Sequence, residues 1–375
     1  MEMKMEELDK ELKIRMMRLL WSSGHFVRSN IPLYSVDGEY KGITDIDVLA
    51  IAFGPDFSAR TTICDCKTGV GVSTPERIFW TSGVIRYFRA DRGFFVRSKI
   101  LESRYVDLAD RLGLLPLSED QLKNFEDVYN IQREYFIGPF KEENLYLENN
   151  RFKNLKEADS KAYHYIKVKY WIDYPHTQIL SLMAYVKKIN ESDKLSNEAK
   201  FFFRMYVLSL LSVSLINFAR KILVISPLER EEQIKERLMG GKVENYEKKA
   251  LLENFYDFIK AEIESKYYGK YPVTKVDFLA HFYPSYTKYV IDLVQRLCSS
   301  PIQSIAAPQL MDLITYELAL KGDGFGKKDI PFHSISYIKT FLKPTKDMIT
   351  FGERTGILPK ENVDKIKETL NKLEE

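Results

Sequence analysis

Residues 42–53 read GITDIDVLAIAF, and residues 60–67 read RTTICDCK. Both stretches are rich in Ile, Val and Thr, and polar residues alternate with apolar ones in part, which is typical of β-strands. The Gly-Pro-Asp sequence at 54–56 between them is a turn signal. The two stretches therefore predict neighbouring strands of one sheet.

The sequence on either side predicts further parts of the same sheet. An Asp-Gly hairpin signal at 37–38 follows a partly alternating stretch at 26–36. Thr74 and Pro75 place an N-cap residue directly before a proline at the first helical position. The expected order is helix 6–23, strands 26–36, 40–53 and 60–67, helix 74–91, strand 93–98, helix 102–112, strand 114–117 and a helix opened by a capping box at 118–121. Because the later strands alternate with helices, they need crossover connections, which favours a mixed sheet flanked by helices.

The pattern of the chain changes near residue 130. Beyond that point the apolar spacing is almost entirely helical. We expect an α/β domain in residues 1–130, a linker or exposed loops in residues 131–156, and an all-α domain in residues 157–375. The uncharged run at 205–219 is shorter than the about 20 apolar residues that a membrane span needs. It predicts a buried core helix, with a membrane span as the alternative.

The composition excludes several classes of protein. The 375 residues carry 56 Lys and Arg against 53 Asp and Glu, a balance typical neither of a disordered acidic chain nor of a polycation. The 3 cysteines and 5 scattered histidines give neither a disulfide framework nor a repeated zinc-ligand spacing. The first residues lack the apolar segment of a secretory signal. We therefore expect a cytoplasmic protein without a membrane partner.

Charged residues gather on the two central strands. Asp45 and Asp47 lie two residues apart on the first strand, so they share one face of it. Asp65 and Lys67 have the same spacing on the second strand. Buried carboxylates are costly unless they are paired or hold a cation. Oxygen ligands from Asp47 and Asp65, with the backbone carbonyl of Cys66, suit Mg²⁺ or Mn²⁺.

A metal ion at this position predicts a reaction class. A bound metal activates water, and Lys67 can orient that water and offset the negative charge that grows on a phosphate. The sequence therefore predicts hydrolysis of a phosphodiester. The alternative is a salt-bridge network at the ends of the strands, and Asp45 is the least certain member of the set.

The pattern of Asp47 followed by Asp-Cys-Lys at 65–67 resembles the signature of the PD-(D/E)xK nuclease superfamily. The surrounding sequence is similar to archaeal-type Holliday-junction resolvases and methyl-directed restriction nucleases, over about residues 6–125. The resemblance implies a restriction-endonuclease-like fold for residues 1–130 and a further acidic residue from the first helix. Glu11 is the best positional match and Glu7 the second. The resemblance also implies a role in prokaryotic defence or DNA repair.

Basic and aromatic residues are interleaved in the helix and strand after the motif. On one continuous helix, Arg86, Arg89 and Arg92 would be spaced three apart and share a face able to contact phosphates. The alternative is a solvated helix face beside an apolar core stripe. The expected nucleic-acid contacts are Arg77, Arg86, Arg89 and Arg92.

The main hypothesis is an Mg²⁺- or Mn²⁺-dependent endonuclease that hydrolyses DNA. Its expected catalytic residues are Asp47, Asp65, Lys67 and Glu11. One alternative is a nuclease-fold subunit without catalytic activity that binds nucleic acid or protein, and another is a nuclease of RNA. The helical domain is expected to select the substrate or to dock a protein partner, and self-association into a homo-oligomer stays open.

Overall fold

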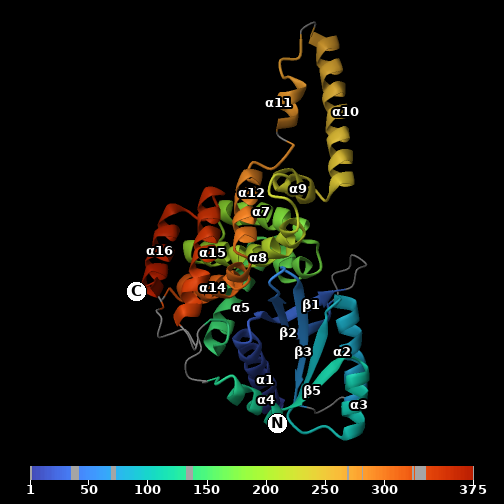
Figure 1. Ribbon diagram of the computed structural model, residues 1–375, viewed down its shortest axis with the longest axis vertical. Coiled ribbons are helices and arrows are strands. Elements are labelled where there is room, and N and C mark those ends of the chain that lie inside the picture. Colours follow the sequence, from blue (N-terminus) through green and yellow to red (C-terminus); the bar gives the residue numbers. More distant parts are fainter. Residues whose placement is uncertain are drawn as a thin grey trace.

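The N-terminal part of the chain folds into one sheet flanked by helices (Figure 1). The computed structural model describes residues 2–34, 42–68, 73–131, 138–267, 270–280, 282–322, 325 and 335–374. The first elements are α1 (Glu2–Ser22), β1 (Phe26–Tyr34), β2 (Gly42–Phe53), β3 (Ala59–Lys67), α2 (Thr74–Phe88), β4 (Arg92–Arg97), α3 (Ser103–Arg111), β5 (Leu114–Ser118) and α4 (Glu119–Val128). The expected Asp-Gly turn at 37–38 lies outside the described residues.

The sheet is mixed, as the sequence predicted. Its strand order is β1-β2-β3-β4-β5. The pairs β1–β2 and β2–β3 are antiparallel, and the pairs β3–β4 and β4–β5 are parallel. The coarse fold class is therefore confirmed, although this architecture alone does not identify a nuclease fold.

Alternating side chains of β3 enter two apolar layers. Cys64 and Cys66 are buried in the layer that contains the apolar side of α1. Ile63 faces the opposite layer, where it packs with Val84 of α2. Burial raises the pKa of both thiols. The two cysteines alternate with Asp65 and act as small buried hydrophobes, as expected.

Helix α2 ends earlier than the sequence predicted. Arg89, the residue directly after it, has φ 56°, in the left-handed region that commonly terminates helices. The chain then reverses, and Arg92 becomes the first residue of β4. The expectation that Arg92 shares a helix face with Arg86 and Arg89 is therefore wrong.

The rest of the described chain is mostly helical, which confirms the second part of the predicted fold class. The elements are α5 (Glu142–Ala158), α6 (Ser160–Lys167), η2 (Lys169–Trp171), α7 (Pro175–Glu191), α8 (Asn197–Leu223), α9 (Arg230–Leu238), α10 (Lys242–Tyr267), α11 (Lys275–Ala280), α12 (Thr287–Ser299), α13 (Pro301–Ser304), α14 (Ala307–Leu313), the π-helix η3 (Ile314–Leu320), α15 (Ile335–Arg354) and α16 (Lys360–Glu374).

The segment predicted as a linker or exposed loops contains helix α5. Its polar residues are numerous, but Phe152 and Leu155 are buried and anchor the helix to the core. One cluster of buried apolar residues includes Met16 of α1, Phe94 of β4 and Phe202 of α8. The α/β and helical regions therefore share a continuous core.

Helix α8 lies in the middle of the helical region (Figure 1). Among the described residues it is the one helix long and apolar enough to cross a membrane, but 89% of its most apolar window is buried inside the protein. Residues 205–219 therefore belong to a core helix, as expected.

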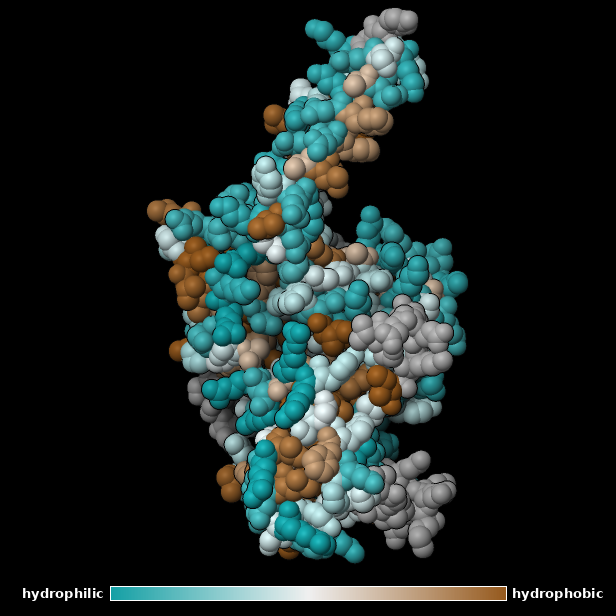
Figure 2. Space-filling view, turned by 90° about the vertical axis from the view of Figure 1, so that its right-hand side faces the viewer, coloured by the Kyte–Doolittle hydropathy of each residue, from teal (hydrophilic) through white to brown (hydrophobic). Residues whose placement is uncertain are grey.

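Helices α10 and α11 project from the rest of the protein as an arm (Figure 1). The sequence predicted one helix over 228–268. Gly240 and Gly241 interrupt it with φ of 109° and 117°, which only glycine adopts readily. Figure 2 shows apolar patches along the arm, where Phe255 and Phe258 are exposed.

Candidate functional site

The carboxylate of Asp47 is held between β2, β3 and α1, and the residue is 5% exposed. Its Oδ2 accepts a hydrogen bond from the backbone amide of Cys66 at 2.9 Å. Its Oδ1 lies 2.7 Å from Nζ of Lys13 and 3.9 Å from Nζ of Lys67. The structure thus brings Asp47 and Lys67 together, as the sequence predicted, and adds Lys13, which sequence reasoning missed.

An acidic residue of α1 also reaches this cluster. Asp9 Oδ2 lies 3.5 Å from Nζ of Lys67, and Asp9 Oδ1 accepts a hydrogen bond from the Thr68 amide at 2.7 Å. The Lys67 side chain remains 38% exposed. Its ammonium group is therefore held by two carboxylates and is still accessible to a ligand from solvent. We call Asp9, Lys13, Asp47 and Lys67 the Asp47 cluster.

Glu11, the residue selected from the first helix, does not belong to this cluster. It is exposed and lies two residues from Asp9, which is about 200° around a helix axis. Asp9 and Lys13 are four residues apart and share a face. Glu7 and Glu11 have the same spacing, so the sequence alone did not favour Asp9 and Lys13 over Glu11. Glu7 and Asp45 are exposed as well.

Asp65 occupies a different environment and is 2% exposed. Its carboxylate accepts hydrogen bonds from Nε of Arg77 at 3.0 Å and from Nη2 of Arg97 at 3.2 Å. The Arg77 guanidinium lies 3.8 Å from the centre of the Trp80 ring, and that of Arg97 lies 3.7 Å from the centre of the Phe95 ring. Two stacked arginines therefore neutralise this carboxylate.

The two carboxylates predicted to bind a metal, Asp47 and Asp65, thus have counter-ions from different elements. The β2–β3 register pairs Val48 with Cys64, so Asp47 and Asp65 are the next positions along the two strands. The partner of Asp47 comes from α1, whereas the partners of Asp65 come from α2 and β4. Adjacent positions in the sheet therefore have separate counter-ions.

The side chains near Asp47 can be compared with what the predicted Mg²⁺ or Mn²⁺ would need as ligands. Within the described ranges, no group of three His, Cys, Asp or Glu side chains is placed to hold a metal ion. Magnesium, however, commonly binds through one or two carboxylates together with water and substrate phosphate. The carboxylates of the Asp47 cluster are paired with lysines and do not form a closed protein cage for an ion.

The predicted nucleic-acid contacts separate into two groups. Arg86 and Arg89 are exposed at the end of α2. Arg77 forms an ion pair with Asp65. Nη2 of Arg92 lies 3.1 Å from Nε2 of His25. Burial, with the charge of Arg92, lowers the pKa of His25 to about 4. Arg86, Arg89 and Arg92 are thus exposed, as expected of phosphate contacts, whereas Arg77 is partly buried against Asp65.

Sequence reasoning also missed a buried polar network between β1 and the helices. Both amino groups of Arg28 donate to the carboxylate of Asp312, with Nη2 to Oδ1 at 2.7 Å. Ser209 donates to the same oxygen at 2.7 Å, and Nε of Arg28 donates to the Tyr206 hydroxyl at 3.1 Å. The strands and helices are 181 to 284 residues apart at these contacts, so no local pattern identifies them.

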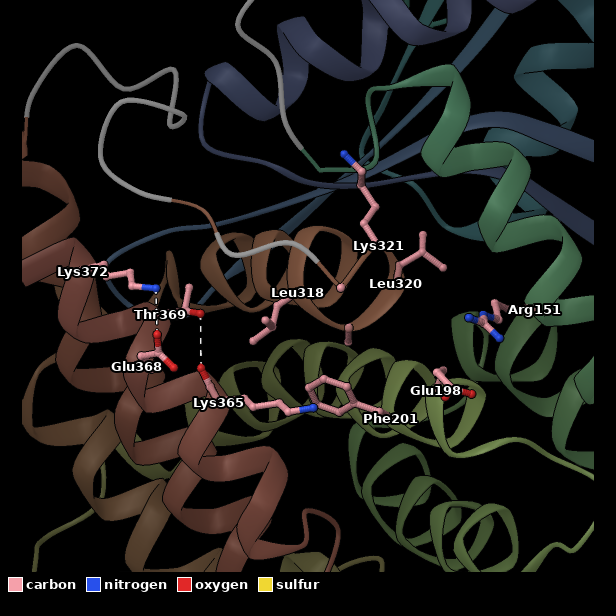
Figure 3. A pocket seen from close by; sticks show the side chains of 12 residues that line it. Arg151, Glu198, Phe201, Leu318, Leu320, Lys321, Lys365, Glu368, Thr369 and Lys372 are labelled. Atoms are coloured by element: carbon pink, nitrogen blue, oxygen red, sulfur yellow. Dashed lines mark hydrogen bonds and ion pairs between the residues drawn. The ribbon is translucent and has the colours of Figure 1, made fainter.

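A cavity of about 390 Å³ lies in the helical region, between α5, α8, η3 and α16 (Figure 3). Its cationic side chains are Arg151, Lys321, Lys365 and Lys372. Lys372 Nζ pairs with Glu368 at 2.8 Å, and Lys321 Nζ lies 3.7 Å from Glu317. No residue of the Asp47 cluster lines this cavity.

Comparison of the chain with protein-family models, with curated proteins and with solved structures gave no match.

Proposed function

We propose that the α/β region is a metal-dependent phosphodiesterase that cleaves DNA at the Asp47 cluster. The observation that supports this most is the meeting of Asp47 and Lys67, since a carboxylate and a partly exposed ammonium group from neighbouring strands converge at 3.9 Å. Both groups suit a phosphodiester, because the lysine can bind a phosphate oxygen and the carboxylate can bind a cation or a water.

Each residue of the cluster has a distinct role in this proposal. The Cys66 amide fixes one oxygen of Asp47, and the other oxygen faces Lys13 and Lys67, so a ligand reaches it only when Lys13 moves away. Asp9 holds Lys67 in place, and Lys13 supplies a second positive charge near the phosphate. Asp47, with Asp65 as the second carboxylate, would hold Mg²⁺ or Mn²⁺, which supplies an activated water and stabilises negative charge. Asp65 takes part only if Arg77 releases it.

A specific observation favours a second candidate function. Asp65 is tied to two arginines, and such a pairing is typical of structural or anion-binding sites. The alternative is therefore a subunit that binds nucleic acid through this region without cleaving it.

A cleavage assay tests the proposal. The purified full chain is incubated with supercoiled DNA, linear DNA and single-stranded RNA, in Mg²⁺, in Mn²⁺ and in EDTA. We expect cleavage of DNA only with a metal, and a loss of about 100-fold or more in Asp47→Asn and in Lys67→Met, because each removes a group that stabilises the transition state.

Two exposed residues supply matched controls. Asp107→Asn on α3 and Lys123→Met on α4 make the same chemical changes at exposed positions and should leave cleavage unchanged. Undiminished cleavage in Asp47→Asn and Lys67→Met would contradict the assignment. Binding of DNA by the unaltered chain, without cleavage under any condition, would favour the second candidate. Cleavage of RNA alone would change the substrate class.

A further inference from the structure

A second cavity, of about 400 Å³, lies between the edge strand β1 and helices α5 and α6. Ser29, Asn30 and Pro32 form its β1 side. Pro32 has no amide hydrogen, and such residues are confined to edge strands or bulges. The volume falls in the range of about 300–1,000 Å³ that is usual for ligand sites, so the cavity can admit a nucleotide-sized group.

The lining of this cavity is cationic. Lys167 pairs with Glu148 at 2.9 Å and lies 3.9 Å from the centre of the Phe152 ring. Lys153 and Lys156 also line the cavity, and both are exposed. Neither of these two forms an ion pair with a carboxylate of the described residues. Two uncompensated positive charges at the mouth of a cavity attract an anion.

Neutral groups complete the lining in a way that suits a nucleotide. Tyr146 is 66% exposed at the rim, and Tyr163 also lines the cavity. Asn149 and Asn150 add amide donors and acceptors. Cationic side chains that track a backbone, combined with aromatic rings on which bases stack, are the common features of single-strand binding grooves.

The cavity is connected to the Asp47 cluster through two side chains. Asn30, on the cavity wall, has φ 51° and accepts a hydrogen bond from Lys13 Nζ at 3.1 Å. The same ammonium group lies 2.7 Å from Asp47. Lys13 therefore contacts both sites.

We propose that this cavity binds a single strand of nucleic acid next to the segment that the Asp47 cluster cleaves. Lys153 and Lys156 contact its phosphates, and Tyr146 stacks on a base. The inference rests on the proposed function for the cleavage that follows, but the binding itself is measured independently of cleavage.

Fluorescence anisotropy of a fluorescein-labelled single-stranded oligodeoxynucleotide, titrated with the full chain in EDTA over a series of salt concentrations, tests this inference. For Lys153→Ala/Lys156→Ala we expect weaker binding and a plot of log affinity against log salt whose slope is smaller by about 1.4, because each phosphate contact to a single strand contributes about 0.7. Tyr146→Ala should weaken binding by about tenfold and leave the slope unchanged, because it removes stacking without charge.

Lys249→Ala/Lys260→Ala is the control, since it removes the same charge from exposed positions on the α10 arm. An unchanged slope in the Lys153/Lys156 variant, or an equal change in the control, would overturn the inference. If the unaltered chain binds the oligonucleotide with the expected slopes but cleaves nothing in Mg²⁺ or Mn²⁺, the proposed function fails and the binding site stands.

Discussion

The buried pair of Arg28 and Asp312 and the Asp47 cluster both join carboxylates to cations, and they differ in their access to solvent. Asp312 is 0% exposed, and Arg28 holds it through two parallel hydrogen bonds. In the Asp47 cluster, the lysine side chain that faces Asp47 and Asp9 is 38% exposed. The first pair has all its partners inside the fold, whereas the second keeps one charged group available for a ligand.

The difference teaches which ion pairs deserve a functional interpretation. The fully buried pair of Arg28 and Asp312 joins β1 to the helical region. Because both partners are hydrogen-bonded inside the fold, Arg28 cannot exchange Asp312 for another anion without unfolding. Lysines in a partly solvated cluster can move to a phosphate at small cost, because an ammonium on a flexible stem is not held in a fixed geometry. Asp65 lies between these two cases, since its partners are arginines but Arg77 is partly exposed.

The largest effect is expected from breaking the buried pair. Asp312→Ala leaves the Arg28 guanidinium buried and without its counter-charge, which should lower the free energy of unfolding by about 3–5 kcal/mol. Urea denaturation followed by circular dichroism measures this change. Replacing both partners, as in Arg28→Met/Asp312→Leu, should recover much of the loss, because no charge is then left buried.

Asp292→Ala is the matched control for this substitution. Asp292 pairs with Arg296 at 3.1 Å and with Arg354 at 3.1 Å, but all three side chains are exposed. Its loss should cost less than about 1 kcal/mol, as is usual for surface pairs. If Asp312→Ala cost no more than Asp292→Ala, the distinction between the two kinds of cluster would fail.

The next effect concerns pH and the buried side of the same comparison. His25 is buried beside Arg92, and its pKa in the folded protein is about 4, below the ordinary value of 6.5. Above pH 6.5 the residue is neutral in both states and has no effect. As pH falls from 6.5 towards 4, the unfolded chain takes up a proton that the folded chain does not, so stability falls with it, by up to roughly 3 kcal/mol.

Urea denaturation of the unaltered protein and of His25→Asn, over the range between about pH 7 and about pH 4, isolates this contribution. The variant should lose less stability on acidification, so the difference between the two curves should narrow as pH falls below 6.5. Parallel curves would show that His25 does not cause the loss of stability between about pH 6.5 and about pH 4. Its Nδ1 lies 3.0 Å from the Leu20 carbonyl, so stability near neutral pH serves as the check on lost contacts.

The sheet could be predicted because its signals are local. The strand pattern of residues 42–53 and 60–67 and the Ser118 capping box depend on neighbouring residues, and the structure has both. Helix α2 begins one residue earlier than expected, at Thr74 and not Pro75, because Ser73 and not Thr74 is its N-cap. The end of α2 depended instead on Arg89 entering a left-handed conformation, for which its residue type gives little signal.

The candidate site could be predicted only in part for a related reason. Asp47 and Lys67 were selected because strand alternation determines where such side chains point. The choice of Glu11 over Asp9 required knowing which side of α1 meets the sheet, and that depends on packing over a distance. Helix α5 was missed because its buried contacts are with distant elements, while its own sequence is polar.

Among these substitutions, Lys67→Met should change stability least and DNA cleavage most. This outcome would distinguish the Asp47 cluster most clearly from the buried pair of Arg28 and Asp312. Lys67→Met removes a partly exposed ammonium group, which should change the free energy of unfolding by less than about 1 kcal/mol, as expected for a solvated pair. Under the proposed function the same substitution should reduce DNA cleavage by about 100-fold or more. Urea denaturation and the plasmid assay on one preparation measure both quantities.

A variant that loses several kcal/mol, with activity falling only as far as the folded fraction does, would place Lys67 with the structural pair of Arg28 and Asp312. A stable and inactive variant would support a role of Lys67 in cleavage, because the loss of activity could not then be explained by a loss of folded protein.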